Sequence, residues 1–233
     1  MLVYEVIDKV NEGPNDPHIF KAIFLAGGPG SGKGFVVKNL MGADSTGLRI
    51  VNSDDVYEKL ASLAKPEPLD LKDPEVVASP QGQEAREKAK KITKARQGNY
   101  LDGRLGLIID GTAKDVEKTK RQKDELESLG YDTMMVFVNT NMEVAQDRNK
   151  QRDRQLPDEM VMQMWHAVQD NLMKFQQLFG NQNFYLVDNS GGLEDPDRKE
   201  NFEAVEKAIR RFINSPPRKP QAKSWLADQR PTK

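Results

Sequence analysis

The segment from Ile23 to Lys33 constrains the fold of this 233-residue chain most strongly, because an apolar stretch there runs directly into a glycine-rich loop that ends in lysine. The loop fits the pattern G-x-x-x-x-G-K, whose glycines allow successive backbone N–H groups to point at phosphate oxygens. The apolar residues before the loop predict a strand. Val36 and Val37 after it belong to a predicted amphipathic helix, whose N-terminus would attract an anion. The alternative interpretation is a tight strand–helix turn without a ligand. The residues that we expect to hold a nucleotide triphosphate are Gly28, Pro29, Gly30, Ser31, Gly32, Lys33 and Gly34.

One position of this loop departs from the usual pattern. The residue after the lysine is commonly Ser or Thr, whose hydroxyl binds Mg²⁺, whereas this chain has Gly34 followed by Phe35. Neither residue offers a hydroxyl. We therefore expect Mg²⁺ to be held mainly by the phosphates, by water and by carboxylates elsewhere in the chain.

Length and composition limit the classes of protein that need to be considered. A chain of this length fits one α/β domain with extensions. The sequence has no cysteine, which excludes disulfides, thiolate zinc sites and cysteine nucleophiles, and its two histidines are too few for a histidine-based metal cluster. No apolar run approaches the length of a membrane span, and the first residues lack a signal-peptide pattern. We therefore expect a cytoplasmic protein.

Five short apolar runs without polar alternation are typical of strands that are buried on both faces of a parallel sheet. Helical patterns fill the gaps between them, among them residues 113–129 and 157–179, each followed by a glycine. Strands that alternate with helices, with a phosphate loop after the first strand, predict a doubly wound α/β fold. The predicted parallel strands are residues 22–25, 48–51, 105–109, 133–138 and 184–187.

The chain divides into three segments. Residues 1–20 form an N-terminal lead-in that ends in a loop-forming cluster of Gly, Pro, Asn and Asp, and residues 21–213 form the α/β domain. Residues 214–233 contain four prolines and several basic residues. We predict that this last segment is a flexible, partly disordered basic tail.

Acidic residues follow three of the predicted strands, at the edge of the sheet where functional side chains emerge in this fold. Asp54 and Asp55 follow the second strand, Asp110 the third and Asp188 the fifth. Transfer of a γ-phosphoryl group to a hydroxyl needs a carboxylate that accepts the hydroxyl proton and Mg²⁺ that bridges the phosphates. We predict that Asp54 or Asp55 accepts the proton and that Asp110 orients metal-bound water. The alternative for Asp54 and Asp55 is capping of a helix over residues 56–63.

Arginines in the helical segment after the fourth strand supply the positive charge that the same reaction needs. Arg148 and Arg152 are four residues apart, so they share one face of a helix and could close together over the phosphates. Arg154 is the spare candidate. The alternative is a solvated charged face on which these arginines pair with Asp147 and Asp153.

In this order, the motifs resemble those of bacteriophage polynucleotide kinases and zeta-toxin-type kinases. The resemblance covers residues 21–190 and implies a P-loop kinase fold with a lid helix, and ATP and Mg²⁺ as cofactors. A phage enzyme would work in the cytoplasm of an infected host. In polynucleotide kinases an arginine that contacts the acceptor phosphate stands where this chain has Tyr57. The resemblance assigns the role of general base to Asp54. We expect Lys33, Arg148 and Arg152 to take part in catalysis with it, and we further expect Asp55 and Asp110 at the metal, Asn189 at the nucleotide and Thr112 at the acceptor.

The distribution of charge gives a clue to the acceptor. Between residues 86 and 96 there are six basic residues and one acidic residue, and Arg86, Lys90 and Lys94 would share one face of a helix. This basic stripe and the basic tail suit contact with a phosphate backbone. The alternative is an ordinary solvated helix face and a tail without a ligand.

Three functional hypotheses remain. The first is a kinase that phosphorylates a hydroxyl on nucleic acid, most readily DNA, at a 5′-OH end or on a 5-hydroxymethylpyrimidine base. The second is a toxin-like kinase of a sugar nucleotide such as UDP-N-acetylglucosamine. The third is a nucleotide-binding module without turnover, which the missing hydroxyl at Gly34 would explain.

Overall fold

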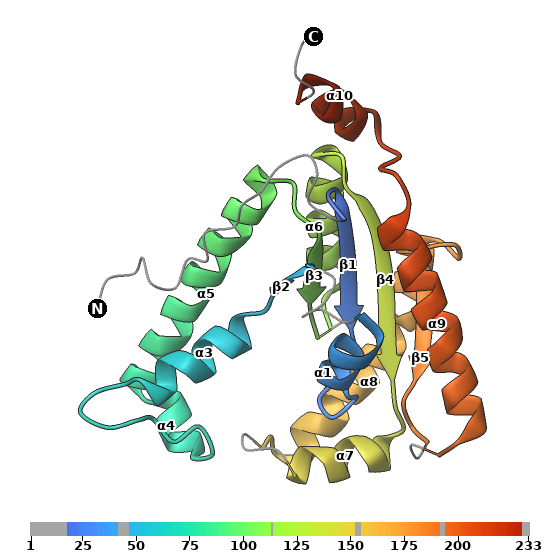
Figure 1. Cartoon of the computed structure of the whole chain (residues 1–233). Coiled ribbons are helices and arrows are strands. Elements are labelled where there is room, and N and C mark those ends of the chain that lie inside the picture. The colour runs from blue at the N-terminus through green and yellow to red at the C-terminus, as the bar shows by residue number, and fades with distance from the viewer. Residues whose placement is uncertain (1–17, 42–46, 113, 152–154, 192–193, 230–233) are drawn as a thin grey trace.

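The computed structural model describes residues 18–41, 47–112, 114–151, 155–191 and 194–229 (Figure 1). Its centre is a five-stranded sheet in the order β2-β3-β1-β4-β5. All four neighbouring strand pairs are parallel, so the carboxyl ends of the strands meet at one edge. The strands are β1 (Lys21–Ala26), β2 (Arg49–Val51), β3 (Leu107–Asp110), β4 (Asp132–Asn139) and β5 (Phe184–Asp188).

Helices connect the strands and cover both faces of the sheet (Figure 1). Among the described helices, none is long and apolar enough to cross a membrane. The helices before β3 are α1 (Lys33–Val36), the π-helix η2 (Val37–Met41), α3 (Ser53–Ser62), α4 (Pro74–Ala78) and α5 (Pro80–Asp102). Those after β3 are α6 (Val116–Ser128), α7 (Met142–Lys150), α8 (Asp158–Phe179), α9 (Pro196–Asn214) and α10 (Pro220–Asp228).

Successive residues of each central strand point to opposite faces, and both faces are apolar. On one face Phe24 and Phe137 pack with Phe175 of α8, and on the other face Ile23 and Val136 pack with helices α1 and α9. This double burial explains why the strands lack polar alternation. The prediction of a doubly wound parallel sheet is therefore confirmed, and the strand bounds differ from the predicted ones by one or two residues at most ends.

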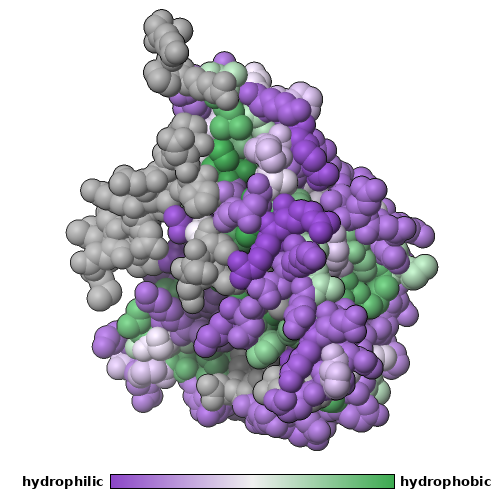
Figure 2. All heavy atoms as spheres, turned by 45° about the vertical axis from the view of Figure 1, so that its right-hand side comes forward, coloured by the Kyte–Doolittle hydropathy of each residue, from purple (hydrophilic) through white to green (hydrophobic). Residues whose placement is uncertain are grey.

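A third, smaller apolar cluster joins α3 to α5 beside the sheet. Val56 and Tyr57 of α3 pack on Ala89 of α5. The pair stands to the side of β2 (Figure 1). The face presented in Figure 2 is mostly hydrophilic with small hydrophobic patches, as expected for a chain in which charged residues make up 30%.

Part of the C-terminal segment that was predicted as a flexible tail is helical. Residues 220–228 form α10, in which Ala222 is fully buried and Trp225 contacts the ring of Phe20 with 5.4 Å between ring centroids. Of the four prolines that suggest disorder, Pro216 and Pro217 precede this helix and Pro220 occupies its first turn, while Pro231 lies outside the described residues. Nearby, the buried Lys21 and Asp132 form a 2.8 Å ion pair at the amino ends of β1 and β4.

Candidate active site

The glycine-rich loop after β1 has a backbone that only glycine adopts readily at two places. Gly30 has φ 72° and Gly32 has φ 88°, both in the left-handed region. Neighbouring atoms also exclude a side chain, because a Cβ on Gly30 would collide with the carbonyl of Ala145 and one on Gly32 with the amide of Asn189. The loop is thus held tightly between α7 and the end of β5, as a phosphate-binding loop requires.

The side chain of Lys33 folds back onto the start of the loop. Lys33 Nζ donates to the carbonyl oxygens of Gly27 at 2.7 Å and Gly28 at 3.3 Å. An incoming phosphate can replace these neutral acceptors with a charged one, which forms the stronger bond. Gly28, Pro29 and Ser31 lie in this loop and Lys33 begins the helix that follows it; nucleotide binding by these residues stays a prediction.

Gly34 leaves open space where a hydroxyl would usually stand. A Cβ built on Gly34 meets nothing within 4 Å, and its backbone is not among the positive-φ glycines. Sterics therefore do not demand glycine at this position.

The carboxylates at the ends of β2 and β3 are joined by the side-chain amide of Asn52. Its Nδ2 lies 3.0 Å from Asp110 Oδ2 and 3.2 Å from Asp55 Oδ1, while its Oδ1 accepts from the backbone N–H of Asp54 at 2.8 Å. Asn52 is thus the N-cap of α3, which starts at Ser53. The alternative interpretation of Asp54 or Asp55 as the cap is wrong, because the helix begins earlier than residue 56.

Burial places Asp110 in an unusual electrostatic setting. Its Oδ1 is buried without a hydrogen-bond partner in the described part of the chain. Burial raises the pKa of Asp110, the charge of Lys33 opposes that rise, and Asp55 and Asp54 add to it. The pKa of Asp55 is also raised, by burial and by the neighbouring Asp54. A cation placed between these carboxylates would stabilise their charged forms and lower their pKa values.

The same group offers an incomplete set of protein ligands for a metal ion. Within the described ranges, no cluster of three or more His, Cys, Asp or Glu side chains is arranged to hold a metal. Asp110 and Asp55 fit Mg²⁺ as oxygen donors, but most of its ligands would have to be phosphate oxygens and water.

Arg148 lies against the phosphate loop. One of its guanidinium nitrogens, Nη1, is 3.6 Å from the Cβ position built on Gly32, and it is buried without a hydrogen-bond partner among the described residues. Burial, and then the charge of Arg198, lowers the pKa of Arg148. This placement favours the prediction of phosphate binding over a solvated face. The other predicted arginine, Arg152, and its spare, Arg154, lie outside the described residues.

Asn189 and Arg198 form a bonded connection between α9 and the phosphate loop. Asn189 Nδ2 donates to the carbonyl of Ser31 at 2.7 Å, and Asn189 Oδ1 accepts from Arg198 Nε at 3.1 Å and Nη2 at 2.8 Å. Asn189 therefore contacts the loop, where we predicted nucleotide binding. Arg198 was not predicted, because a single arginine in a polar helix start carries no recognisable signal.

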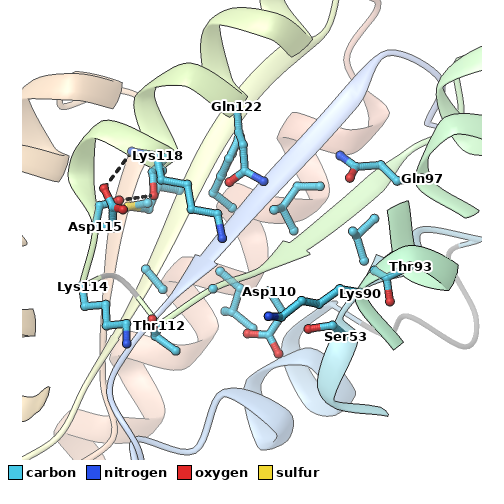
Figure 3. Close-up of a pocket in the computed structure, with 18 of the residues that line it drawn as sticks. Ser53, Lys90, Thr93, Gln97, Asp110, Thr112, Lys114, Asp115, Lys118 and Gln122 are labelled. Atoms are coloured by element: carbon cyan, nitrogen blue, oxygen red, sulfur yellow. Dashed lines mark hydrogen bonds between the residues drawn. The ribbon is translucent and has the colours of Figure 1, made fainter. Parts of the chain in front are cut away.

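A cavity of about 250 Å³ opens beside Asp110, between α5 and α6 (Figure 3). Lys90 and Lys94 of the predicted stripe line it, as does Thr112. Arg86 does not line the cavity and instead lies over the ring of Tyr57, with Cζ 5.1 Å from the ring centroid. Sequence reasoning missed the opposite wall, which is formed mainly by Lys114, Asp115, Lys118, Thr119 and Gln122.

The charges around this cavity favour a negatively charged ligand. Four lysines face two aspartates, Asp110 and Asp115. Lys90 pairs with Glu87 at 2.6 Å, but among the described residues no ion pair is present for the other three lysines. The hydroxyl of Thr93 in the same wall is buried and has no partner in the described structure.

Comparisons with known proteins agree with this arrangement. The family model described as Zeta toxin matches residues 6–200. A structure from the PezAT toxin–antitoxin system of Streptococcus pneumoniae is similar with a TM-score of 0.59 at 16% identity, over 86% of this chain and 90% of that chain. An AvrRxo1-ORF1:-ORF2 structure with ATP has a TM-score of 0.53 at 14% identity, over 90% of this chain and 80% of that chain.

A structure of the Pnkp1/Rnl/Hen1 RNA repair complex has a TM-score of 0.50 at 21% identity, over 69% of this chain and 48% of that chain. At such identities these likenesses show a shared fold. No curated protein matches the chain significantly.

Proposed function

Because this chain belongs to the zeta toxin family and has a P-loop kinase fold, we propose that it transfers the γ-phosphate of ATP to a hydroxyl of a small, negatively charged acceptor. The acceptor class that fits best is a sugar nucleotide such as a UDP-sugar. The observation that carries this choice is the cavity beside Asp110, which is of limited volume and has four lysines in its walls.

The donor half of the site has the groups that a triphosphate needs. The glycine backbone offers N–H groups, Lys33 exchanges its carbonyl contacts for phosphate, and the buried Nη1 of Arg148 gains the partner that it lacks among the described residues. Mg²⁺, held by Asp110 and Asp55 together with phosphates and water, would neutralise charge on the β- and γ-phosphates.

An acceptor bound in the cavity would bring its hydroxyl to the side of Asp110, which lines the cavity. The hydroxyl oxygen attacks the γ-phosphorus, the bond to the β-phosphate oxygen breaks, and ADP leaves. The hydroxyl proton passes to a carboxylate, for which we propose Asp54. Thr112 lines the same cavity and would contact the acceptor.

The lysines of the cavity would bind anionic groups of the acceptor. Lys94, Lys114 and Lys118 have no ion pair among the described residues, so an acceptor phosphate would not have to displace a carboxylate from them. A volume of about 250 Å³ suits part of a sugar nucleotide or a single nucleotide, and it is too small for a duplex.

A hydroxyl on nucleic acid remains the second candidate, because one terminal nucleotide could enter the same cavity. Two features weaken it. Arg86 of the predicted stripe stacks on Tyr57, and the basic tail binds at the far end of the sheet, where Arg218 Nε lies 3.3 Å from Asp132 Oδ1. Neither residue extends a phosphate-binding surface from the cavity.

Transfer from γ-labelled ATP with Mg²⁺ to a panel of acceptors tests the proposal. The panel contains UDP-sugars, 5′-OH DNA and RNA oligonucleotides, and DNA with 5-hydroxymethylpyrimidines. We expect label on a UDP-sugar, a large loss of transfer in Lys94→Ala and Lys118→Ala, and little loss in the control Lys88→Ala, because Lys88 is on the same helix as Lys94 but does not line the cavity. Label on nucleic acid alone would establish the second candidate. ATP binding without transfer to any acceptor would favour a nucleotide-binding module without turnover.

A further inference from the structure

Arg198 is connected to the chain on both sides of Lys33, through Asn189 on one side and Phe35 on the other. On the N-terminal side it holds Asn189 Oδ1 through two hydrogen bonds, and the amide of Asn189 holds the carbonyl of Ser31. On the C-terminal side its Cζ lies 5.2 Å from the ring centroid of Phe35. The residues before and after Lys33 are therefore both connected to the guanidinium of Arg198.

The guanidinium is itself fixed in place. Arg198 is only 8% exposed, although it belongs to a polar helix start. Its Cζ lies 4.6 Å from the ring centroid of Phe202, one turn further along α9, so the cation lies against two aromatic rings. A buried arginine with these contacts keeps one orientation, and it can therefore hold the side chains of Asn189 and Phe35 in place.

The side chain of Asn189 is bonded to the arginine through its oxygen and to the loop through its nitrogen. Its side-chain amide occupies the space where a side chain on Gly32 would stand, directly before Lys33. If Asn189 moved, Ser31 and Gly32 would lose their outer support, and the N–H groups of the loop would no longer be held in one arrangement.

We propose that Arg198 is a positioning residue, which holds the phosphate loop in its nucleotide-binding conformation through Asn189 and Phe35. It is not expected to touch the acceptor. The proposal rests on the function proposed above, since it concerns the affinity of this loop for ATP. The proposal also explains why the charged side chain of Arg198 is buried beside the phosphate loop, although the proposed phosphoryl transfer does not use it.

Binding and kinetics of three variants test the role. Arg198→Met keeps apolar bulk against the rings but removes the hydrogen bonds, Arg198→Lys keeps the charge, and Asn189→Asp keeps an acceptor for Arg198 while losing the donor to Ser31. The matched control is Arg210→Met, because Arg210 lies on the same helix with a 68% exposed side chain paired to Glu206.

We expect Arg198→Met and Asn189→Asp to raise the Kd for ATP and its KM by about 10-fold or more, as for loss of a hydrogen bond to a charged group. The Kd of Arg198→Lys for ATP should lie between those of these two variants and that of wild type. In all three variants the KM for the acceptor should stay within twofold of the wild-type value. The control Arg210→Met should match wild type in both quantities. Combining Arg198→Met with Asn189→Asp should raise the Kd for ATP by less than the product of the two single effects, because both changes break one connection.

Two results would overturn the inference. If the Arg198 and Asn189 variants melt at lower temperature but bind ATP as wild type does below that temperature, the residue serves stability alone. If wild type binds ATP and the double variant shows the full product of the single effects, the two side chains act separately. Failure of wild type to bind ATP would instead overturn the proposed function, and this inference with it.

Discussion

Gly34→Ser gives the sharpest test of how this site holds its metal. A Cβ at this position meets nothing within 4 Å, and Gly34 lies in α1 without a positive φ. A serine can therefore be added without moving a neighbour. Its hydroxyl would stand directly after Lys33, where P-loop proteins commonly bind Mg²⁺.

The expected magnitudes follow from this open position. Replacing glycine by alanine at a compatible helical position stabilises a protein by about 0.4–1 kcal/mol, and serine should give roughly half of that. An added oxygen ligand should lower the Mg²⁺ concentration for half-maximal activity by about 10-fold, which corresponds to about 1.4 kcal/mol of binding free energy.

Gly34→Ala separates these two effects, because it adds the Cβ without the hydroxyl. Urea unfolding measures the stability of both variants, and the rate of phosphate transfer over a Mg²⁺ titration measures metal affinity. Only the serine variant should shift the titration. An equal shift with alanine would show that the hydroxyl is not a ligand, and loss of ATP binding in both variants would show that the position is not open.

Four further outcomes are expected. Asp54→Asn should lower kcat by about 10²- to 10⁴-fold with unchanged ATP affinity by calorimetry; retained turnover would remove Asp54 as the base. Lys33→Ala should weaken ATP binding by at least about 10-fold in the same titration. Asp110→Asn should stabilise the protein at pH 7 by on the order of 1 kcal/mol in urea unfolding. The pKa of Asp110 is raised in the folded state, so the wild-type protein loses stability as pH rises from the unfolded pKa of this carboxyl through its folded pKa. The stability advantage of Asp110→Asn over wild type should therefore vanish near pH 3, where the carboxyl is protonated in both states. Lys21→Met should destabilise by about 3 kcal/mol, since it leaves Asp132 buried without its closest partner, and the same unfolding measurement checks it.

Much of the fold could be predicted because its determinants are local. The apolar runs that become β1 and β4 are buried on both faces, so they carry a signal that does not depend on their partners. The C-terminal helix α10 could not be predicted in this way. Its order depends on the contact of Trp225 with Phe20, a residue at the other end of the chain.

The candidate site, too, could be predicted only in part from the sequence. The resemblance to zeta-toxin-type kinases is confirmed at the level of family and fold, and the phosphate loop, Arg148 and Asp110 are brought to the same edge of the sheet. Roles for individual residues stay predictions. The basic stripe on α5 could be recognised as positively charged, but its sequence did not show that Lys90 and Lys94 face a cavity while Arg86 stacks on Tyr57.

By itself, the sequence determined the parallel α/β architecture, the glycine-rich loop and the positions of the acidic residues at the strand ends, because the apolar runs, the glycine spacing and the residues that follow each strand can be read along the chain. Only the tertiary structure decided which cations meet the loop and the cavity. Arg198 lies 165 positions after Lys33, and α6 supplies Lys118 opposite α5. These side chains come together because of the way in which the helices pack on the sheet. That packing depends on contacts between residues far apart in the sequence rather than on any local pattern.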